Sequence, residues 1–416
     1  MRPIVSTRRS LALCLAASLM LAACGALWSG SSAADDTIVF GATIPITGPK
    51  AEEGRYTRDG YQFYIDTLNQ RGGIVVGGRA YKVRLHYYDD ASDPARVGPL
   101  YERLIAQDRV TFLLGPYSSQ LTVAAIPIAE KHRVPMVAAH GSAESLYSED
   151  NGYTFSIVSP ARNYLRGIIA LVLAKDPSLR TVALLGADEP FSHEVLDGAA
   201  EYATEHNLTV ISQALYPLNT GDVRDLLTAV KRGNPDLVLV AGHLQDAILI
   251  VKQAKELGVT PKAIGFTSGP STPEFRANLQ KDADYIFGAT QWTSALHYSG
   301  IGLWATPRDY AAAFQAAHRD YAQVPYQTAE STAALIAFQH AIEQAGSLDS
   351  EAVRAAFANL DVMTFYGRIK FDARGVNMYK PMAVEQLQPD GKIYTVFPSD
   401  VAEKAALYPM LPWSQR

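Results

Sequence analysis

The sequence predicts an α/β protein with two doubly wound parallel-sheet lobes joined by a three-segment hinge. Apolar runs of strand length alternate with segments whose apolar residues recur at helical spacing, and this alternation starts again near residue 159. A chain of 416 residues also exceeds what one hydrophobic core usually supports. Segments late in the chain complete neither lobe alone, which predicts three crossings between lobes. These segments are residues 285–292, 329–345 and 367–372.

The lobe boundaries follow from where the second series of strands begins and where the late segments return. We expect the first lobe to comprise residues 37–158 and 286–365, and the second lobe residues 159–285 and 366–416. Two similar lobes in tandem predict a cleft between them, and several crossings predict a hinge.

Composition indicates an ordinary globular protein, with 48% hydrophobic and 19% charged residues. The formal net charge is -5, and no stripe of Lys and Arg interleaved with aromatic residues occurs. The charge balance therefore argues against a nucleic-acid partner. We expect a monomer.

The first 24 residues have the pattern of a secretion signal peptide. An apolar run over residues 11–21 is too short for a permanent membrane span, and a basic start precedes it. The basic residues are Arg2, Arg8 and Arg9. We therefore expect an exported protein.

Residues 21–24, Leu-Ala-Ala-Cys, resemble the bacterial lipobox, whose cysteine carries lipid in the mature protein. We expect lipidation of Cys24, a lipid anchor in the membrane, and a flexible tether over residues 25–36. A plain cleaved signal with an incidental cysteine is the alternative. The other cysteine, Cys14, lies inside the leader, so no internal disulfide is expected. The expected location is the periplasm or cell envelope.

The first lobe is predicted to run β-α-β-α-β-α-β. A strand over residues 37–46 leads into a helix with apolar residues at intervals of three and four, then an alternating strand and an Asp- and Pro-containing turn. Two short apolar strands, residues 110–114 and 134–138, flank a later helix. The helical positions are Tyr61, Tyr64, Ile65 and Leu68, and the alternating strand carries Val83, Leu85 and Tyr87.

Two polar turns follow these short strands, at residues 115–119 and 140–142. Because carboxyl ends of parallel strands meet at one sheet edge, we expect the turns to lie side by side. Free backbone N–H groups and serine hydroxyls there predict a site for the carboxylate of a small acid. The alternative is two ordinary loops, in which Ser119 caps a helix and Gly141 allows a tight reversal.

The second lobe repeats the strand and helix alternation. Helices are predicted over residues 222–232 and 247–257. The predicted strands are residues 181–185, 209–215, 237–240 and 263–267.

Several short motifs occur in a particular order between residues 37 and 409. They are Pro45-Ile46-Thr47-Gly48-Pro49, Asn69 with Gly72-Gly73, Asp89-Asp90 to Pro94, Gly115-Pro116-Tyr117-Ser118-Ser119, Ala345-Gly346-Ser347-Leu348-Asp349, Thr364-Phe365-Tyr366-Gly367 and Ile369-Lys370-Phe371-Asp372. In this order and spacing the chain resembles the type I periplasmic solute-binding proteins of ABC importers, the Leu/Ile/Val-binding class.

The resemblance implies a set of ligand-binding positions. Hydroxyl and backbone groups of the first lobe hold the ligand carboxylate in that family, and aromatic residues of the second lobe close over the ligand. The matching carboxylate-binding positions are Ser119, His140 and Ser142, and the closing positions are Phe191 and His243. We add Tyr117, Thr267 and Trp292 as expected ligand-binding residues.

One departure from the family leaves the ligand class open. The family's amino-acid binders pair the ligand ammonium with an acidic residue of the second lobe, but the matching segment, residues 265–269, has no carboxylate. Either a nearby acid substitutes, or the ligand is an aromatic or other acid without an amine. The candidate substitutes are Asp188, Glu189, Asp246 and Glu330, and further aromatic surface comes from Tyr326 and Phe365.

We therefore interpret the chain as the extracytoplasmic substrate-binding component of an ABC transporter. It is expected to capture a small carboxylate solute by lobe closure and deliver it to a membrane permease. A ligand-sensing protein that serves a receptor or regulator is the alternative. Catalysis is not expected, because the G-x-S-x-G, H-E-x-x-H, phosphate-loop and G-x-G-x-x-G patterns do not occur. No cofactor or metal is expected.

Overall fold

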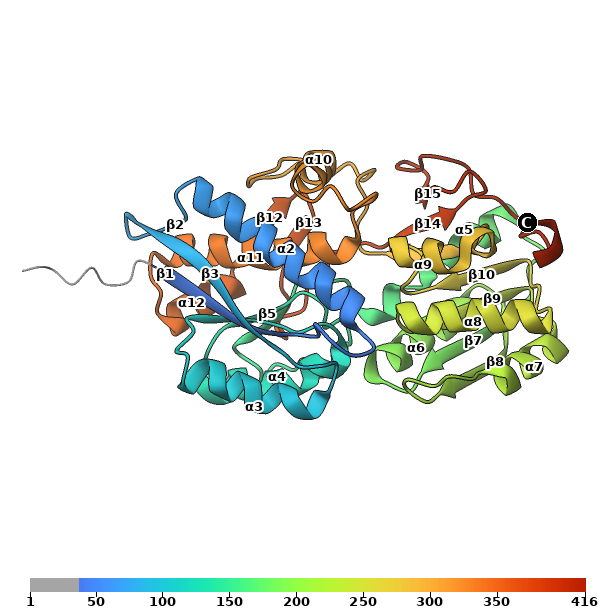
Figure 1. The fold of residues 1–416 in the computed structure, drawn as a ribbon, viewed down its shortest axis with the longest axis horizontal. Helices are drawn as coiled ribbons and strands as arrows, with labels where there is room; N and C mark the ends of the chain where they lie inside the picture. The colour runs from blue at the N-terminus through green and yellow to red at the C-terminus, as the bar shows by residue number, and fades with distance from the viewer. Residues whose placement is uncertain (1–36) are drawn as a thin grey trace, which may run out of the picture. The chain divides into compact units, whose positions relative to one another are not determined.

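The computed structural model describes residues 37–416, which form two sheets with helices on both faces of each (Figure 1). This confirms the predicted α/β fold with two lobes. The predicted signal peptide, Cys24 and the tether over residues 25–36 lie outside the described residues.

The first-lobe sheet has the strand order β2-β3-β1-β4-β5-β6 within the described chain. The β1/β4, β4/β5 and β5/β6 pairs are parallel, and β2 and β3 form an antiparallel hairpin. Gly77 and Gly78 connect the hairpin with φ angles of 56° and 87°, which favour glycine in a two-residue turn. The bounds are β1 Thr37–Ile44, β2 Ile74–Val76, β3 Arg79–Asp89, β4 Phe112–Leu114, β5 Met136–Ala138 and β6 Thr154–Ser156.

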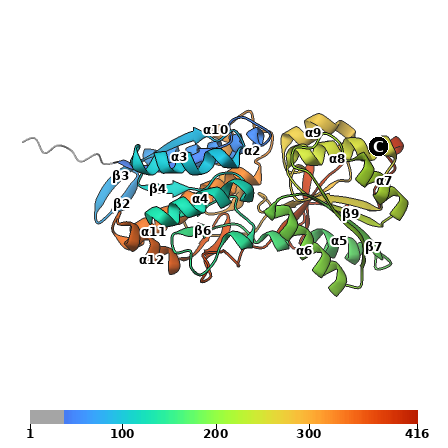
Figure 2. The same cartoon turned by 90° about the horizontal axis from the view of Figure 1, so that it is seen from below.

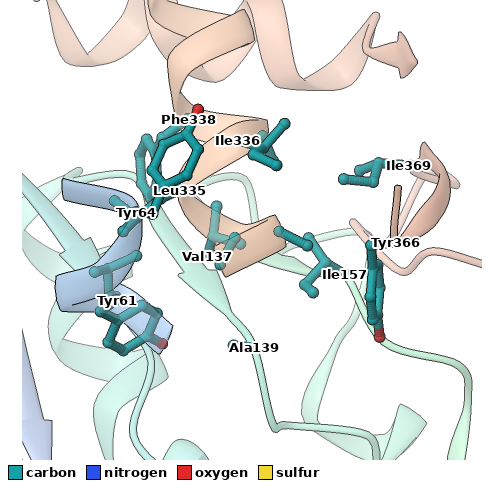
Figure 3. Close-up of a cluster of buried hydrophobic side chains, with 14 of the residues drawn as sticks. Tyr61, Tyr64, Val137, Ala139, Ile157, Leu335, Ile336, Phe338, Tyr366 and Ile369 are labelled. Atoms are coloured by element: carbon teal, nitrogen blue, oxygen red, sulfur yellow. The ribbon is translucent and has the colours of Figure 1, made fainter. Parts of the chain in front are cut away.

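Helices cover both faces of this sheet. On one face, buried residues of α2 (Ala51–Gln70), α11 (Tyr326–Ala345) and α12 (Ser350–Ala358) form one core cluster with the sheet, part of which Figure 3 shows. On the other face, α3 (Pro94–Ala106) and α4 (Ser119–His132) form a second cluster. The predicted helical positions Tyr61, Tyr64, Ile65 and Leu68 are all buried in the first cluster. The helix α10 (Pro307–Ala317) also packs there.

The second-lobe sheet has the order β15-β14-β11-β10-β9-β7-β8 within the described chain. The strands from β11 to β8 are parallel, while β14 and β15 are antiparallel additions at one edge. The predicted strands are confirmed to within two residues. The bounds are β7 Thr181–Ala187, β8 Thr209–Tyr216, β9 Leu237–Ala241, β10 Ala263–Phe266, β11 Phe287–Thr290, β14 Ala383–Leu387 and β15 Ile393–Phe397.

Alternate residues of β7 face opposite helical layers of this lobe. Leu184 packs with α5 (Arg166–Lys175) and α6 (Pro190–Glu205), and Leu185 packs with the helices of the other face. Figure 2 shows these two layers on opposite sides of the sheet. The second layer comprises α7 (Arg224–Gly233), α8 (Leu244–Leu257) and α9 (Pro273–Leu279). Short 3-10 turns are η1 (Glu144–Leu146), η2 (Ala161–Asn163), η3 (Gln280–Ala283) and η4 (Trp413–Gln415).

Within the described residues, two of the crossings between the lobes come later in the chain than the predicted boundaries. The strand β11 belongs to the second sheet, so the return to the first lobe follows Thr290 and not residue 285. The hairpin of β12 (Asp361–Thr364) and β13 (Gly367–Lys370) stays with the first lobe, because Ile369 is buried in its core. An isolated parallel β-bridge between Ser156 and Val376 keeps the segment after the hairpin beside the first-lobe sheet as well.

Within residues 37–416, none of the helices combines the length and apolarity needed to cross a membrane.

Candidate functional site

The two predicted polar turns do lie side by side. Strands β4 and β5 pair in parallel with Leu114 opposite Val137, so their carboxyl ends meet at one edge. The Ser119 Oγ accepts a hydrogen bond of 3.1 Å from the Ala143 backbone N–H, which ties the turns together. The Ser119 hydroxyl therefore links the two turns. It does not cap α4, whose N-terminus has no hydrogen bond from a capping side chain.

These turns form one wall of a cavity between the two lobes. The first lobe supplies the two turns and the start of α11, and the second lobe supplies the segments near η2, α6, α8 and the end of β10. The lining residues are Tyr117, Ser118, Ser119, His140, Ser142, Tyr164, Phe191, His243, Ser268, Tyr326 and Glu330. Six of the expected residues are brought together here: Tyr117, Ser119, His140, Ser142, Phe191 and His243.

Two expected residues, Thr267 and Trp292, do not line this cavity. The Thr267 hydroxyl donates to the Gly242 carbonyl and accepts from the Gly242 N–H, so backbone groups occupy it. The Trp292 indole N–H donates to the carbonyl of Phe365, and the ring is buried in the first-lobe core. Both positions follow sheet strands, but the Thr267 side chain binds backbone groups and the Trp292 side chain points into the first-lobe core.

Serine hydroxyls give the first-lobe wall hydrogen-bond donors. The Tyr164 Oη accepts from the Gln291 amide at 2.8 Å and lies 2.8 Å from Ser142 Oγ, and either of these two hydroxyls can be the donor in that contact. Ser119 thus already accepts one hydrogen bond and keeps its proton for another acceptor, while Ser142 shares one hydrogen bond with Tyr164.

The start of α4 adds to this donor wall. The Ser118 Oγ is buried and has no hydrogen-bond partner within the described chain. Ser118 also has a φ of 138°, a strained conformation for a residue with a side chain. The partial positive charge of the α4 N-terminus lies at the same place. This wall therefore suits an anion.

His140 and Glu330 form a buried pair at the cavity. The His140 Nδ1 lies 2.6 Å from Glu330 Oε1, and the side chains are 1% and 3% exposed. The His140 Nε2 contacts the hydroxyls of Thr57 and Ser331, both of which donate to backbone carbonyls. Those hydroxyls are therefore acceptors, and His140 Nε2 carries a proton.

The remaining proton of this pair is shared between His140 Nδ1 and Glu330. Burial lowers the pKa of His140 to about 3 and raises the pKa of Glu330 well above its usual range. The pair thus carries one proton between its two facing atoms and no net charge at neutral pH. Glu330 Oε2 has no partner within the described chain and remains an acceptor at the cavity.

A second buried chain of polar contacts joins the lobes at His243. The His243 Nδ1 lies 3.0 Å from Tyr117 Oη, and its Nε2 lies 2.7 Å from Glu189 Oε1. Burial raises the pKa of Glu189, but the charge and hydrogen bond of His243 outweigh it, and the pKa of Glu189 is lowered. Glu189 is therefore ionised and engaged with a protein partner.

The four candidate substitutes for the missing acid have different surroundings. Of these, only Glu330 lines the cavity. Glu189 pairs with His243, Asp246 accepts from the His243 backbone N–H, and Asp188 is exposed beside His193.

Three lining residues were not predicted from the sequence: Ser118, Tyr164 and Ser268. Glu330 was predicted only as one of four candidate acids, and Tyr326 only as further aromatic surface. Ser118 lies inside the predicted turn at residues 115–119, and Ser268 directly follows Thr267, so both adjoin expected positions. Tyr326 and Glu330 lie one helical turn apart at the start of α11, which indicates a shared face. Tyr164 lies in a crossing segment and has no local signal.

Residues 37–416 contain no group of three or more His, Cys, Asp or Glu side chains placed to hold a metal ion. The cavity instead combines hydroxyls, aromatic rings and one electroneutral acid–imidazole pair.

This fold recurs in proteins of known structure. The substrate-binding protein LivJ of a branched-chain amino acid transporter from Streptococcus pneumoniae, in complex with isoleucine, has a TM-score of 0.74 at 21% identity, covering 90% of this chain and 100% of that chain. A solute-binding protein of an ABC transporter from R. palustris, in complex with benzoate, has a TM-score of 0.74 at 18% identity, covering 86% and 95%. The class defined by fold and cavity is the type I periplasmic binding protein.

Sequence comparison reaches the same class. "Leu/Ile/Val-binding protein homolog 8" of Brucella abortus (strain 2308) is 25% identical over 384 residues, which cover 88% of this chain and 91% of that protein. The model of the family described as periplasmic binding protein matches residues 37–392. The chain belongs to the periplasmic binding protein family, in its Leu/Ile/Val-binding group, and the resemblance inferred from its motifs is confirmed.

Proposed function

We propose that this protein is the substrate-binding component of an ABC transporter, which captures a small carboxylate solute between its lobes and delivers it to a permease. The observation that carries the proposal is the donor wall of Ser118, Ser119 and Ser142. Ser119 accepts from a backbone N–H and keeps its own proton, and the buried Ser118 Oγ has no hydrogen-bond partner within the described chain. Export and a lipid on Cys24 complete the proposal, since a tethered binding protein stays near its permease.

We infer that the solute is an aromatic carboxylate rather than an amino acid. Aromatic rings from both lobes line the cavity: Tyr117, Tyr164, Phe191 and Tyr326. An ammonium group would need an uncompensated negative charge, whereas Glu330 and His140 together carry none. The Glu330 Oε2 suits a neutral donor such as a phenolic hydroxyl.

A binding screen tests the ligand class. Isothermal titration and thermal shift of the purified protein with benzoate, 4-hydroxybenzoate, phenylalanine and isoleucine should show the tightest binding for 4-hydroxybenzoate. Tighter binding of isoleucine than of benzoate and 4-hydroxybenzoate would contradict the proposal that the solute is aromatic. It would remain consistent with the proposed carboxylate site. Failure of all four acids would contradict the solute class.

The carboxylate site predicts the effect of removing its hydroxyls. A hydrogen bond to a charged group contributes about 1.5–3 kcal/mol, so Ser142→Ala should weaken acid binding by roughly tenfold or more. The double variant Ser119→Ala/Ser142→Ala should abolish the thermal shift. Ser299→Ala, at an exposed position of the first lobe, is the matched control. Circular dichroism checks that each variant folds, and an unchanged affinity in Ser142→Ala would remove Ser142 from the site.

A further inference from the structure

A second cavity lies between the lobes, apart from the donor wall. Its volume is about 200 Å³. The first lobe contributes α10 and the segment before α11, and the second lobe contributes β14, the start of β15 and the loops near Ser271 and Glu403. Gln323 spans the lobes here, because its Nε2 donates to the Ser271 carbonyl at 2.5 Å.

Two carboxylates line this cavity, and no Lys, Arg or His is among its lining residues in the described chain. Glu385 is 9% exposed, and its Oε2 is buried without a hydrogen-bond partner among residues 37–416. Glu403 lies at the exposed side and accepts from the Thr395 N–H. Among residues 37–416, the charged group that acts on Glu385 is Glu403, and no cation offsets the two carboxylates there.

The lining also includes a buried serine hydroxyl and two aromatic rings. The Ser271 Oγ is also buried and unpartnered within the described chain, and Ser271 is 5% exposed. Trp292 lines the cavity while its one N–H is occupied by Phe365, so it contributes aromatic surface. Tyr326 lines this cavity as well as the solute cavity. Carboxylates beside aromatic faces are the surroundings that organic ammonium ions prefer.

We propose that this second cavity binds a small organic amine, whose ammonium group pairs with Glu385 and Glu403 and packs against Trp292 and Tyr326. Because residues of both lobes line the cavity, an amine bound there favours the closed arrangement. Because Tyr326 is a wall of both cavities, amine and acid are expected to influence each other's affinity while binding together.

The protonation of Glu385 supports the proposal. Burial and, second, the nearby charge of Glu403 raise the pKa of Glu385 to about 8, so its carboxyl is protonated at neutral pH. The titratable side chains that line the cavity are Glu385, Glu403 and Tyr326. An arriving ammonium ion stabilises the carboxylate form, so binding near pH 7 releases a proton from Glu385 to solvent.

Titration of the purified protein with 1,4-diaminobutane and with butylammonium, in phosphate buffer, tests the site without any knowledge of the solute. We expect saturable binding that Glu385→Gln weakens tenfold or more and Glu403→Gln weakens severalfold. Glu149→Gln, at an exposed carboxylate outside both cavities, should leave amine affinity unchanged. Calorimetry in two buffers of different ionisation enthalpy should show release of a proton, which Glu385→Gln removes.

Several outcomes would overturn this inference. They are the absence of saturable amine binding, equal affinity in wild type and Glu385→Gln, or binding without proton release. A thermal unfolding scan of Glu385→Gln shows whether that variant folds, and the exposed Glu403→Gln tests the site independently. Displacement of bound benzoate by the amine would show one continuous site and contradict the second cavity. Loss of acid binding alone would contradict the proposed function and leave the amine site intact.

Discussion

Individual residues in the cleft combine burial with the absence of net charge. Glu330 and His140 are almost wholly buried, yet one shared proton leaves them neutral as a pair. A buried ion without such compensation would cost several kcal/mol. The protonation of Glu330 therefore affects the stability of this region. It also means that Glu330 Oε2 suits a neutral hydrogen-bond donor better than a cation.

Substitution of Glu330 distinguishes the neutral pair from an ion pair. Glu330→Gln keeps a donor for His140 Nδ1, so we expect its free energy of unfolding to lie within about 1 kcal/mol of wild type. Glu330→Ala leaves His140 Nδ1 unpartnered and should cost about 1–3 kcal/mol. Urea unfolding measures both. Equal destabilisation by Gln and Ala would indicate an ionised pair instead.

The stability of the protein should depend on pH through Glu385. Its pKa is raised to about 8, so between roughly pH 5 and 8 the folded chain holds a proton that the unfolded chain lacks. Stability from this group is present at low pH and is lost as pH rises, at most about 1.4 kcal/mol per pH unit.

Glu385→Gln removes this titration. The free energy of unfolding of the variant, relative to that of wild type, should therefore increase as pH rises from 5 to 8. Urea unfolding in phosphate at several pH values measures the difference, and buffers free of amines keep the second cavity out of the comparison. A difference that stays constant with pH would contradict the raised pKa.

At the scale of elements, the close packing of α2 on α11 positions Glu330. A Cβ at Gly60 of α2 would lie 2.4 Å from the Thr328 carbonyl oxygen and 2.8 Å from the Ser331 Cβ, both on α11. Thr332 Oγ1 donates to the Gly60 carbonyl across the same contact. Only glycine lets the two helices approach this far.

Gly60→Ala should therefore destabilise the protein by about 1–3 kcal/mol, because the helices must separate. Gly152→Ala is the control, since its nearest neighbour, the Arg354 Cδ, is 3.8 Å from the added carbon. Alanine restricts the unfolded chain more than glycine does, so the control should be neutral or up to about 1 kcal/mol more stable. Denaturant unfolding of both variants checks this, and equal effects would contradict the packing argument.

At the scale of the whole molecule, a few polar contacts join the lobes away from the solute cavity. Arg55 of α2 lies 2.8 Å from Glu274 at the start of α9, and Tyr56 also donates to Glu274. Glu53 Oε1 accepts from the Leu244 N–H at 3.1 Å, where α8 begins. In the proposed mechanism these contacts would stabilise the closed state without touching the solute, and so raise its affinity indirectly.

Glu274→Ala should lower the affinity for a bound acid severalfold, because a half-buried ion pair and a hydrogen bond stabilise the closed state by about 1 kcal/mol. Titration calorimetry measures affinity, and small-angle scattering should show a larger radius of gyration in the variant at subsaturating acid. Glu256→Ala removes an exposed ion pair with Arg224 inside the second lobe and should leave affinity unchanged. Unchanged affinity in Glu274→Ala would show that the contact does not stabilise closure.

Much of the architecture follows from local periodicity in the sequence. The intervals of Tyr61, Tyr64, Ile65 and Leu68 predict a helix face, and the strands of both sheets occur where short apolar runs are bounded by turns. The adjacent turns at Ser119 and Ser142 were also predictable, because the carboxyl ends of parallel strands meet.

What the sequence by itself determined is thus the two-lobed α/β fold, the order of its elements and the donor-bearing turns at the sheet edge, since each depends on neighbours within a few residues. Only the tertiary structure decided that Glu330 meets His140, 190 residues away, and that Thr267 and Trp292 lie outside the first cavity. It also decided that the β12–β13 hairpin stays with the first lobe. These contacts join residues that are far apart in the sequence, so they depend on how closely helices and sheets pack. The spacing of residues within one helix or strand does not predict that packing.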